Sequence, residues 1–355
     1  MSTPFDLLRM TDGLIVHHCL GAAAKLGIAD MLKDGARSTE NLAAALEVNE
    51  DALYRTLRFL GGQGVFHETA PRKFTNSPLS EWLRTDVPES IRSILIYRNS
   101  AFFLAPFSDL LYSIETGAPA REKGLDVNGF EHLRRNPEDA HLFDAAMTEI
   151  SGLWASSVAA AYDFGKWGSL MDVGGGNGML LATIMAVHSE LQGVLADQPH
   201  VLQRASQHKC WQPSLLRRVR FEAMDFFQAI PSGCRAYLMK NILHDWDDER
   251  ARQILFNCRR AIPEDGVLLL IEYSVGGANK PSIGKTVDLM MLTLTGGKER
   301  TVREHDKLLV NAGFRVKRSI PLSNDIMILE AEPVAFVGEI AEDPPRPDRY
   351  PIVGK

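Results

Sequence analysis

The stretch Met171-Asp-Val-Gly-Gly-Gly-Asn-Gly178 decides the fold of this chain. A short apolar run, SLMDV at 169–173, leads into it, and a helix-forming run, MLLATIMAVH at 179–188, follows. Glycines at such a turn let the backbone bend sharply and approach a ligand, and the start of the helix adds exposed N–H donors. The stretch therefore predicts the first strand, the ligand-binding loop and the first helix of an open α/β sheet.

Strand-like and helix-like segments alternate from about residue 168 onward. Such alternation is typical of a Rossmann-like, mostly parallel sheet with helices on both faces. The last two strand-like runs are separated by only a short turn, which favours an antiparallel edge. Seven runs are predicted to be strands: SLMDV 169–173, GVLAD 193–197, VRFEAMD 219–225, AYLMKN 236–241, VLLLIEY 267–273, FRVKRSI 314–320 and DIMILEA 325–331.

The N-terminal hundred residues have a mainly helical pattern. Three helices are predicted to begin near Asp12, Ser38 and Asn49, because these side chains cap helix N-termini well. The segment VFHETAPRKFTNS at 65–77 then predicts two short strands joined by a turn. Three helices followed by a hairpin form a winged-helix pattern. Its third helix carries acidic residues and a long apolar face as well as two arginines, so dimerisation is favoured over DNA binding.

Composition narrows the class of protein. The 355 residues predict about two domains, and a formal net charge of −6 argues against nucleic acid as a main partner. Cys19, Cys210, Cys234 and Cys258 form no CxxC pair, which predicts free thiols in a reducing compartment. No signal peptide and no run of about 18 apolar residues is present, so a cytoplasmic protein that does not enter the membrane is expected.

The glycine loop does not have the pattern of a phosphate-binding loop. The third small residue of a dinucleotide fingerprint is replaced by Met179, and no Gly-Lys-Ser/Thr follows the glycines. Asp197 and Asp225 nevertheless end the next two predicted strands, where a carboxylate can accept hydrogen bonds from ribose hydroxyls or from an exocyclic amine. Phe226 adds an apolar ring beside Asp225. Together these residues predict a nucleoside ligand that carries no phosphate, such as S-adenosylmethionine.

His244 is the candidate catalytic base. It follows the fourth predicted strand, in Lys240-Asn-Ile-Leu-His-Asp-Trp246, and a neutral imidazole with a pKa of about 6.5 can deprotonate a hydroxyl at neutral pH. Asp245 points to the opposite face if the chain is extended, so it is a poor partner for the ring. Glu272 and Glu299 are the candidates to orient it. No DxD or His cluster suggests a metal, and none is expected.

The motifs DVGGGNG, ADQPHV, DFF, KNILHDWDDE and GGKERT together resemble the class I O-methyltransferases of the caffeic acid and hydroxyindole type, including bacterial small-molecule relatives. The resemblance extends over nearly the whole chain, to about residue 330. It implies a seven-stranded methyltransferase sheet, dimerisation through the N-terminal domain, and methyl transfer from S-adenosylmethionine to a hydroxyl of a small, largely aromatic acceptor. This chain departs from the family at Ala223-Met224, where a glycine usually precedes Asp225.

The resemblance also implies a role for each matching residue. The expected cofactor-binding residues are Gly174 and Gly176 at the methionine part, Asp197 at the ribose, Asp225 and Phe226 at the adenine, and Lys240 at the edge of the fourth strand. His244 is the expected base, with Glu272 and Glu299 beside it. The expected acceptor contacts are Phe143, Met147, Met290 and Met291, which are equally well explained as ordinary core residues.

Four parts of the chain are predicted on this basis. They are a winged-helix-like dimerisation domain at 1–100, a helical linker that contributes to the acceptor pocket at 101–165, the cofactor-binding catalytic domain at 166–332 and a loosely ordered tail at 333–355. Two alternatives stay open: a relative that binds the cofactor but runs hydroxylation or decarboxylation, and a winged-helix regulator that senses the cofactor. The acceptor itself, and whether nitrogen or sulfur can replace oxygen, is left undecided by the sequence.

Overall fold

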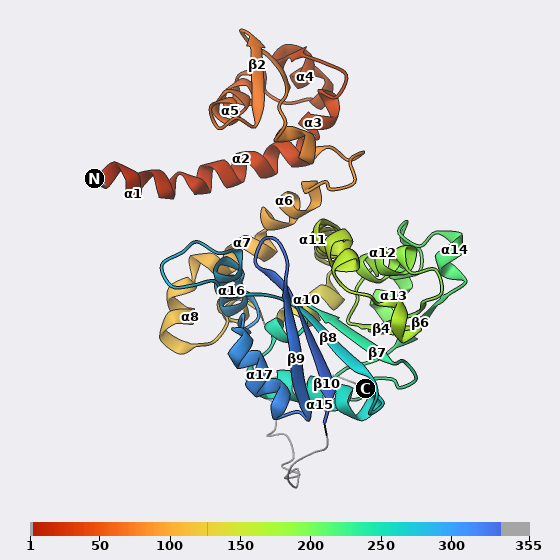
Figure 1. The fold of residues 1–355 in the computed structure, drawn as a ribbon. Coiled ribbons are helices and arrows are strands. Elements are labelled where there is room, and N and C mark those ends of the chain that lie inside the picture. Colours follow the sequence, from red (N-terminus) through yellow and green to blue (C-terminus); the bar gives the residue numbers. More distant parts are fainter. Residues whose placement is uncertain (1–2, 126, 335–355) are drawn as a thin grey trace. The chain divides into compact units, whose positions relative to one another are not determined.

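The computed structural model describes residues 3–125 and 127–334 of the chain (Figure 1). The chain divides into two compact units, Met1–Leu104 with Glu138–Leu153, and Ala105–Pro137 with Trp154–Lys355. The long helix α11 (Pro137–Ala161) supplies residues to both units. The tail predicted at 333–355 lies outside the described residues from position 335 onward.

Two of the three predicted helix starts in the first unit have the expected cap, whereas the Asp12 side chain makes no capping hydrogen bond and follows a helix, Pro4–Thr11, that was not predicted. The Ser38 side chain accepts a hydrogen bond from the Asn41 N–H, and the Asn49 side chain accepts one from the Ala52 N–H. Gly27 ends the second helix in the left-handed conformation, at φ 67°. The helices of this unit are α1 (Pro4–Thr11), α2 (Gly13–Leu26), α3 (Ile28–Met31), α4 (Thr39–Leu46), α5 (Glu50–Gly62), η1 (Ser80–Leu83), α6 (Arg92–Arg98) and the start of α7 (Ala101–Ser108).

A small antiparallel sheet completes the first unit. Its strand order is β1 (Arg37–Ser38), β3 (Lys73–Asn76) and β2 (Phe66–Ala70). The predicted hairpin at 65–77 is therefore present. Leu42, Leu57, Leu60 and Phe74 are fully buried between this sheet and helices α4 and α5, and they form the core of the unit.

Seven strands form the sheet of the second unit, at the positions that the sequence predicts. Their order is β6-β5-β4-β7-β8-β10-β9. The first five pair in parallel, whereas β10 is antiparallel to both β8 and β9, as the short connection predicts. The strands are β4 (Ser169–Val173), β5 (Gln192–Asp197), β6 (Val219–Ala223), β7 (Ala236–Lys240), β8 (Val267–Tyr273), β9 (Phe314–Pro321) and β10 (Ile326–Pro333).

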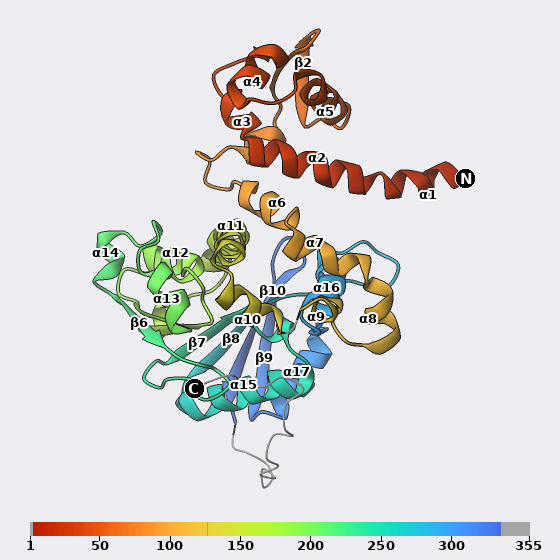
Figure 2. The ribbon, with the colours of Figure 1, turned by 180° about the vertical axis from the view of Figure 1, so that it is seen from behind.

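Helices cover both faces of this sheet, which explains why its central strands are largely apolar. Met171 and Val173 of β4 share a buried cluster with Ile254 of α15 (Asp248–Ala261) and Leu309 of α17 (Val302–Val310). Figure 2 shows α15 and α17 across this face. On the other face, Gly193 of β5 leaves space for side chains of α12 (Met179–Val187).

The strand order places a crevice at the carboxyl end of β4. Because β5 and β7 pair with opposite edges of β4, the chain leaves these strand ends in opposite directions and opens a binding site there. The remaining helices of the unit are α8 (Leu110–Thr116), α9 (Ala120–Lys123), α10 (Gly129–Arg135), η2 (Gly165–Trp167), α13 (Pro199–Ala205), α14 (Pro213–Leu216), η3 (Leu243–Asp245) and α16 (Ile283–Leu294).

Two chain-wide predictions can be compared with the structure. Cys19, Cys210, Cys234 and Cys258 are all free, as the absence of paired spacings predicts. Within residues 3–125 and 127–334, no helix combines the length and the hydropathy that are needed to cross a membrane.

Candidate active site

The glycine loop after β4 has a backbone that only glycine adopts easily. Gly174, Gly176 and Gly178 have φ values of 71°, 58° and 81°. A Cβ on Gly178 would lie 2.2 Å from the Trp211 ring, whose Nε1 donates to the Asn177 carbonyl. A Cβ on Gly176, in contrast, would meet nothing within 4 Å. The loop is thus held from below by Trp211 and open above Gly176, where a ligand can approach the backbone.

Asp197 lies beside this opening. Its Oδ2 accepts a hydrogen bond of 2.9 Å from the Gly176 N–H, and its Oδ1 accepts one of 2.7 Å from the Gln198 N–H. Each carboxylate oxygen can accept more than one hydrogen bond, so the carboxylate can still bind a pair of ribose hydroxyls. The structure therefore brings together Gly174, Gly176 and Asp197, the residues predicted to bind the methionine part and the ribose.

Phe226 and Asp225 form the next part of the crevice. The edge of the Phe226 ring is 3.7 Å from the position of a Cβ on Gly174, so the ring borders the glycine loop. Asp225 Oδ1 accepts from the Phe227 N–H at 2.9 Å, which fixes the turn after β6. Asn257 Nδ2 donates to the Phe226 carbonyl and holds the same turn from α15. Both residues thus occupy the side of the crevice at which adenine is predicted.

Lys240 ends β7 between two carboxylates. Burial lowers the pKa of Lys240 to about 8, while the charges of Glu272 and Asp172 favour the ammonium form. Burial raises the pKa of Asp172 to about 7 against the opposing effect of Lys240. The Asp172 carboxylate lies directly beneath the glycine loop, because a Cβ on Gly175 would be 2.6 Å from its Oδ2. Lys240 therefore links the floor of the cofactor crevice electrostatically to Glu272.

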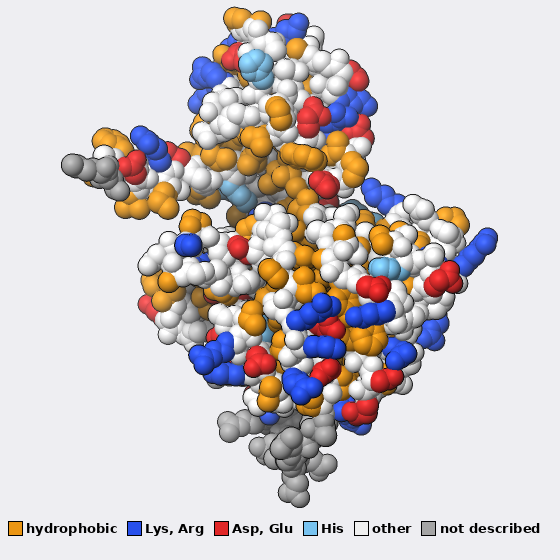
Figure 3. Space-filling model, in the orientation of Figure 1, with side chains coloured by type: hydrophobic (Ala, Val, Ile, Leu, Met, Phe, Trp, Pro, Cys, Tyr) orange, Lys and Arg blue, Asp and Glu red, His pale blue; other side chains and the backbone are white. Residues whose placement is uncertain are grey.

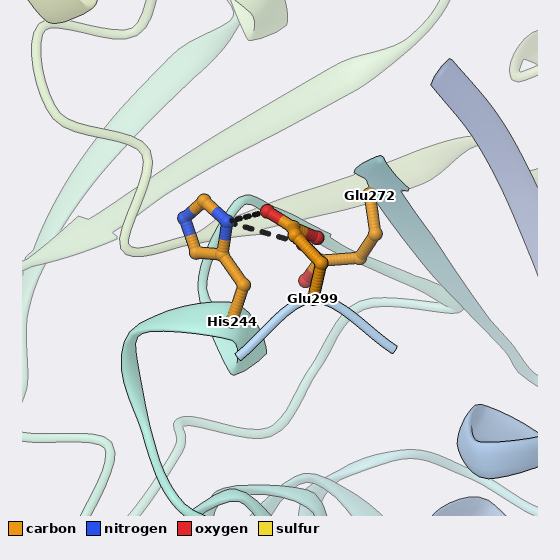
Figure 4. Close-up of side chains that lie close together, drawn as sticks. All are labelled: His244, Glu272 and Glu299. Atoms are coloured by element: carbon orange, nitrogen blue, oxygen red, sulfur yellow. Dashed lines mark hydrogen bonds and ion pairs between the residues drawn. The ribbon is translucent and has the colours of Figure 1, made fainter. Parts of the chain in front are cut away.

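His244 lies on the turn η3 and faces two glutamates (Figure 4). Its Nδ1 is 2.6 Å from Glu299 Oε1 and 4.0 Å from Glu272 Oε2. Glu272 Oε1 accepts from the Leu243 N–H at 3.2 Å, so this carboxylate also holds the backbone of the turn. All three side chains are at most 8% exposed. The sequence prediction that Glu272 and Glu299 flank the ring agrees with this geometry.

The ionisation of His244 differs from the sequence expectation of an imidazole near its ordinary pKa. Burial lowers the pKa of His244, but the charges of Glu299 and Asp245, the hydrogen bond to Glu299 and the charge of Glu272 outweigh burial and raise it to about 9. Burial also raises the pKa of Glu272. The ring is thus a stronger base than a free histidine, and its protonated form is stabilised in a buried site.

Asp245 corrects one sequence argument. The expectation that its side chain points away from His244 assumed an extended chain, whereas residues 243–245 form a 3₁₀ turn. In this turn Asp245 Oδ1 is 3.8 Å from His244 Nε2, on the side of the ring opposite Glu299. Burial raises the pKa of Asp245 to about 6, against the effects of His244 and Arg121. A third carboxylate therefore contributes to the electrostatics of the ring.

Two further residues of the GGKERT segment support the base, and sequence reasoning did not assign a role to either. A Cβ on Gly297 would lie 1.9 Å from the His244 carbonyl oxygen, so only glycine allows this segment to pass the turn. Arg300 is 1% exposed and donates to the carbonyls of Leu243 and Trp246, which flank His244. The signal in the sequence was their position within the same motif as Glu299.

The four predicted acceptor contacts are distributed over both units. Phe143 and Met147 lie on α11 in the first unit, where the Phe143 ring is 5.7 Å from the Tyr97 ring. Met290 and Met291 lie on α16 in the second unit. All four are half-buried. Contact with an acceptor remains a prediction for each of them.

Comparison with known proteins shows which family has this arrangement of domains. Residues 107–315 match the O-methyltransferase domain family, and residues 8–86 match the O-methyltransferase dimerisation domain family. A phenazine O-methyltransferase of Lysobacter antibioticus is 37% identical over 92% of this chain and 96% of its own. An 8-amino-8-demethylriboflavin N,N-dimethyltransferase of Streptomyces davaonensis is 34% identical over 91% of this chain and 93% of its own.

A solved structure extends the comparison to the ligand. The O-methyltransferase of neocarzinostatin biosynthesis, in complex with S-adenosylmethionine and 2-hydroxy-5-methyl naphthoic acid, has a TM-score of 0.76 at 31% identity and covers 90% of this chain and 96% of its own. The chain belongs to the O-methyltransferase family with an N-terminal dimerisation domain. It is an S-adenosylmethionine-dependent methyltransferase.

Proposed function

We propose that the chain transfers a methyl group from S-adenosylmethionine to a hydroxyl oxygen of a small aromatic acceptor, with His244 as the general base. The hydrogen bond of 2.6 Å between His244 Nδ1 and Glu299 Oε1 carries this proposal. In the neutral ring it assigns the remaining proton to Nδ1, which leaves the Nε2 lone pair to accept the proton of the acceptor.

The cofactor-binding residues support the first half of this proposal. The opening above Gly176 and the carboxylate of Asp197 suit the amino acid and ribose parts of the cofactor, and Phe226 with Asp225 suits the adenine. Lys240, at the end of β7, would contact the cofactor when it is bound. When bound, the cofactor supplies a sulfonium-activated methyl group. The protein then has to hold the acceptor oxygen in line and remove its proton.

The charges around His244 support the second half. A pKa of about 9 is close to the pKa of about 10 of a phenol, so transfer of the phenolic proton to the ring is nearly balanced. Glu299 orients the ring and stabilises the imidazolium that forms. Glu272 adds a second negative charge and, through the Leu243 N–H, holds the turn. No step in this proton transfer calls for a metal.

An aromatic acceptor is inferred from the relatives, whose names give phenazine, flavin and naphthoic acid compounds. Half-buried Met290 and Met291, in the same unit as His244, offer apolar surface of the kind that such rings require. The dimethyltransferase among the relatives acts on an amine nitrogen, so transfer to an aromatic amine is the second candidate. An amine loses its proton more easily after methyl transfer than before it, which would make His244 less important in that reaction.

A homodimer is proposed for the active form. The match to the dimerisation domain family is accompanied by exposed apolar side chains on α1 and α2, which Figure 3 shows along the N-terminal arm. A group of large hydrophobic residues this exposed marks a protein interaction site. The residues are Phe5, Leu7, Leu8, Met10, Leu14 and Ile15, each at least 53% exposed.

Transfer of label from methyl-labelled S-adenosylmethionine to a panel of phenols, hydroxyindoles, alcohols and aromatic amines tests the proposal. His244→Ala should lower transfer to oxygen about 10²-fold or more, with cofactor binding by calorimetry unchanged. His67→Ala, an exposed histidine of the first unit, is the matched control and should be as active as wild type. Undiminished transfer to oxygen by His244→Ala would refute the role of the base.

A further inference from the structure

Arg300 is the largest side chain that the described part of the protein buries fully. Only 1% of it is exposed. A guanidinium out of contact with water is costly unless its donors are satisfied, so its place in the core needs an explanation.

Apart from a long hydrogen bond of 3.5 Å to the Lys298 carbonyl in its own segment, the hydrogen bonds of Arg300 are to the chain around His244. Nη1 donates to the Leu243 carbonyl and Nη2 to the Trp246 carbonyl, both at 2.8 Å. Nε and Nη2 also donate to Asp248 Oδ1, at 3.0 and 2.9 Å. Leu243 directly precedes His244 in the sequence, and Trp246 and Asp248 follow it by two and four residues. One planar fork therefore fixes the turn that carries the imidazole on both of its sides.

Arg300 is also the sequence neighbour of Glu299, the hydrogen-bond partner of the His244 ring. Glu299 precedes Arg300, and its Oε1 is 2.6 Å from His244 Nδ1. The Glu299 N–H also donates to Asp288 Oδ1 at 2.9 Å, which holds the segment on its other side. Loss or displacement of the Arg300 hydrogen bonds would therefore move Glu299 relative to the turn that carries His244.

We propose that Arg300 is a positioning residue of the reaction, which keeps the Glu299 carboxylate in register with His244 by tying the segment 297–300 to the turn at 243–246. The inference rests on the proposed role of His244 as base. A lysine cannot substitute, because a single ammonium group cannot reach two carbonyls and a carboxylate in the same plane.

Arg300→Lys is the first variant to test, beside Arg259→Lys as its matched control. Arg259 is a second buried arginine, whose guanidinium donates to the Gly313 and Val334 carbonyls and to Glu264, away from the base. Both variants replace a buried guanidinium and its hydrogen bonds, so both should lose a similar free energy of unfolding. Only Arg300→Lys should lower kcat, by about 10- to 100-fold, because a small misplacement of catalytic groups has effects of this size. KM for the cofactor should stay within about threefold.

The pH dependence supplies a readout that a purely structural role would not move. The apparent pKa of His244, followed by NMR of the labelled imidazole, should fall from about 9 toward 6.5 in Arg300→Lys, because the contact with Glu299 loosens. It should stay unchanged in Arg259→Lys. If Arg300→Lys does not fold, Asp248→Ala removes one partner of the guanidinium from an exposed position and should shift the same pKa in the same direction by less.

The outcomes are separable. The positioning role would be overturned if the His244 pKa in Arg300→Lys, or in a folded Asp248→Ala variant, equalled that of wild type. It would also be overturned if Arg259→Lys shifted this pKa as much as Arg300→Lys does. Full activity of His244→Ala would overturn the proposed base instead. The NMR titration would in that case still report whether Arg300 controls the His244–Glu299 contact.

Discussion

Replacing Glu299 with glutamine should move the pH dependence of methyl transfer to lower pH. Glutamine keeps the shape of the side chain and can still accept from His244 Nδ1, but it removes a buried negative charge. In the wild-type site, burial favours the neutral ring and is outweighed first by Glu299, then by Asp245 and Glu272. The difference between the ordinary pKa of 6.5 and about 9 corresponds to about 3 kcal/mol in favour of the imidazolium.

The loss of Glu299 removes the largest of the effects that raise the pKa, while burial remains. We therefore expect the apparent pKa of kcat/KM to fall from about 9 to between about 7 and 8 in Glu299→Gln. The rate at high pH should fall about tenfold, because a weaker base removes the proton of the acceptor less readily. At pH 7 the lower base strength of the variant is opposed by its larger fraction of neutral imidazole, because only about 1% of the wild-type ring is neutral at that pH.

Initial rates of labelled methyl transfer between pH 6 and pH 10.5 measure this shift. Cofactor binding is measured in parallel, so that losses of affinity are not mistaken for losses of rate. Glu249→Gln, an exposed change in the first turn of α15, is the control and should leave the profile unchanged. An inflection that stays near 9 in Glu299→Gln would refute the argument that Glu299 sets the basicity of His244.

Three further variants test other parts of the structure. Gly297→Ala should lower kcat by about 10- to 100-fold and stability by about 1–3 kcal/mol, measured by urea unfolding, because its Cβ would meet the His244 carbonyl at 1.9 Å; wild-type kcat would contradict this. Asp197→Asn should weaken cofactor binding by calorimetry about 10- to 100-fold, through loss of hydrogen bonds to a charged acceptor; an unchanged Kd would remove Asp197 from the site. Burial lowers the pKa of His305 to about 4, and neither ring nitrogen has a partner, so the unfolded state takes up the proton first as pH falls from 6.5 to 4. Between pH 6.5 and pH 4 the free energy of unfolding of the wild type, measured by urea unfolding, should therefore fall by up to about 3 kcal/mol through this histidine, whereas that of His305→Phe should lack this fall. Equal falls in the two proteins would be evidence against this linkage.

The sequence predicted the strands well, and the candidate residues His244, Glu272 and Glu299 lie together in the structure, while their roles stay predictions. Strand runs such as VLLLIEY are apolar because helices cover both faces of the sheet, and capping residues such as Asn49 mark helix starts locally. Glu272 and Glu299 were predicted beside His244, although 27 residues separate them along the chain, because their motifs were recognisable.

Geometry between neighbouring residues was predicted less well. The sequence did not reveal that residues 243–245 turn, so the Asp245 side chain was expected to point away from His244. It also could not predict the pKa of His244, because that value depends on the balance between burial and three carboxylates whose distances the fold sets. Arg300 looked like one more charge in a polar motif, since only the folded chain shows that it is buried.

The close approach of Gly297 to the His244 carbonyl has a consequence for protein engineering. A side chain at Gly297 would collide with the His244 carbonyl and Arg300 is fully buried, so these two positions are poor choices for sequence libraries. Met290 and Met291 of α16, which are half-buried and predicted to contact the acceptor, are better positions for variation. Because libraries at Met290 and Met291 leave the packing between Gly297, Arg300 and the His244 turn unchanged, a change in acceptor preference among their members would test the predicted contact directly.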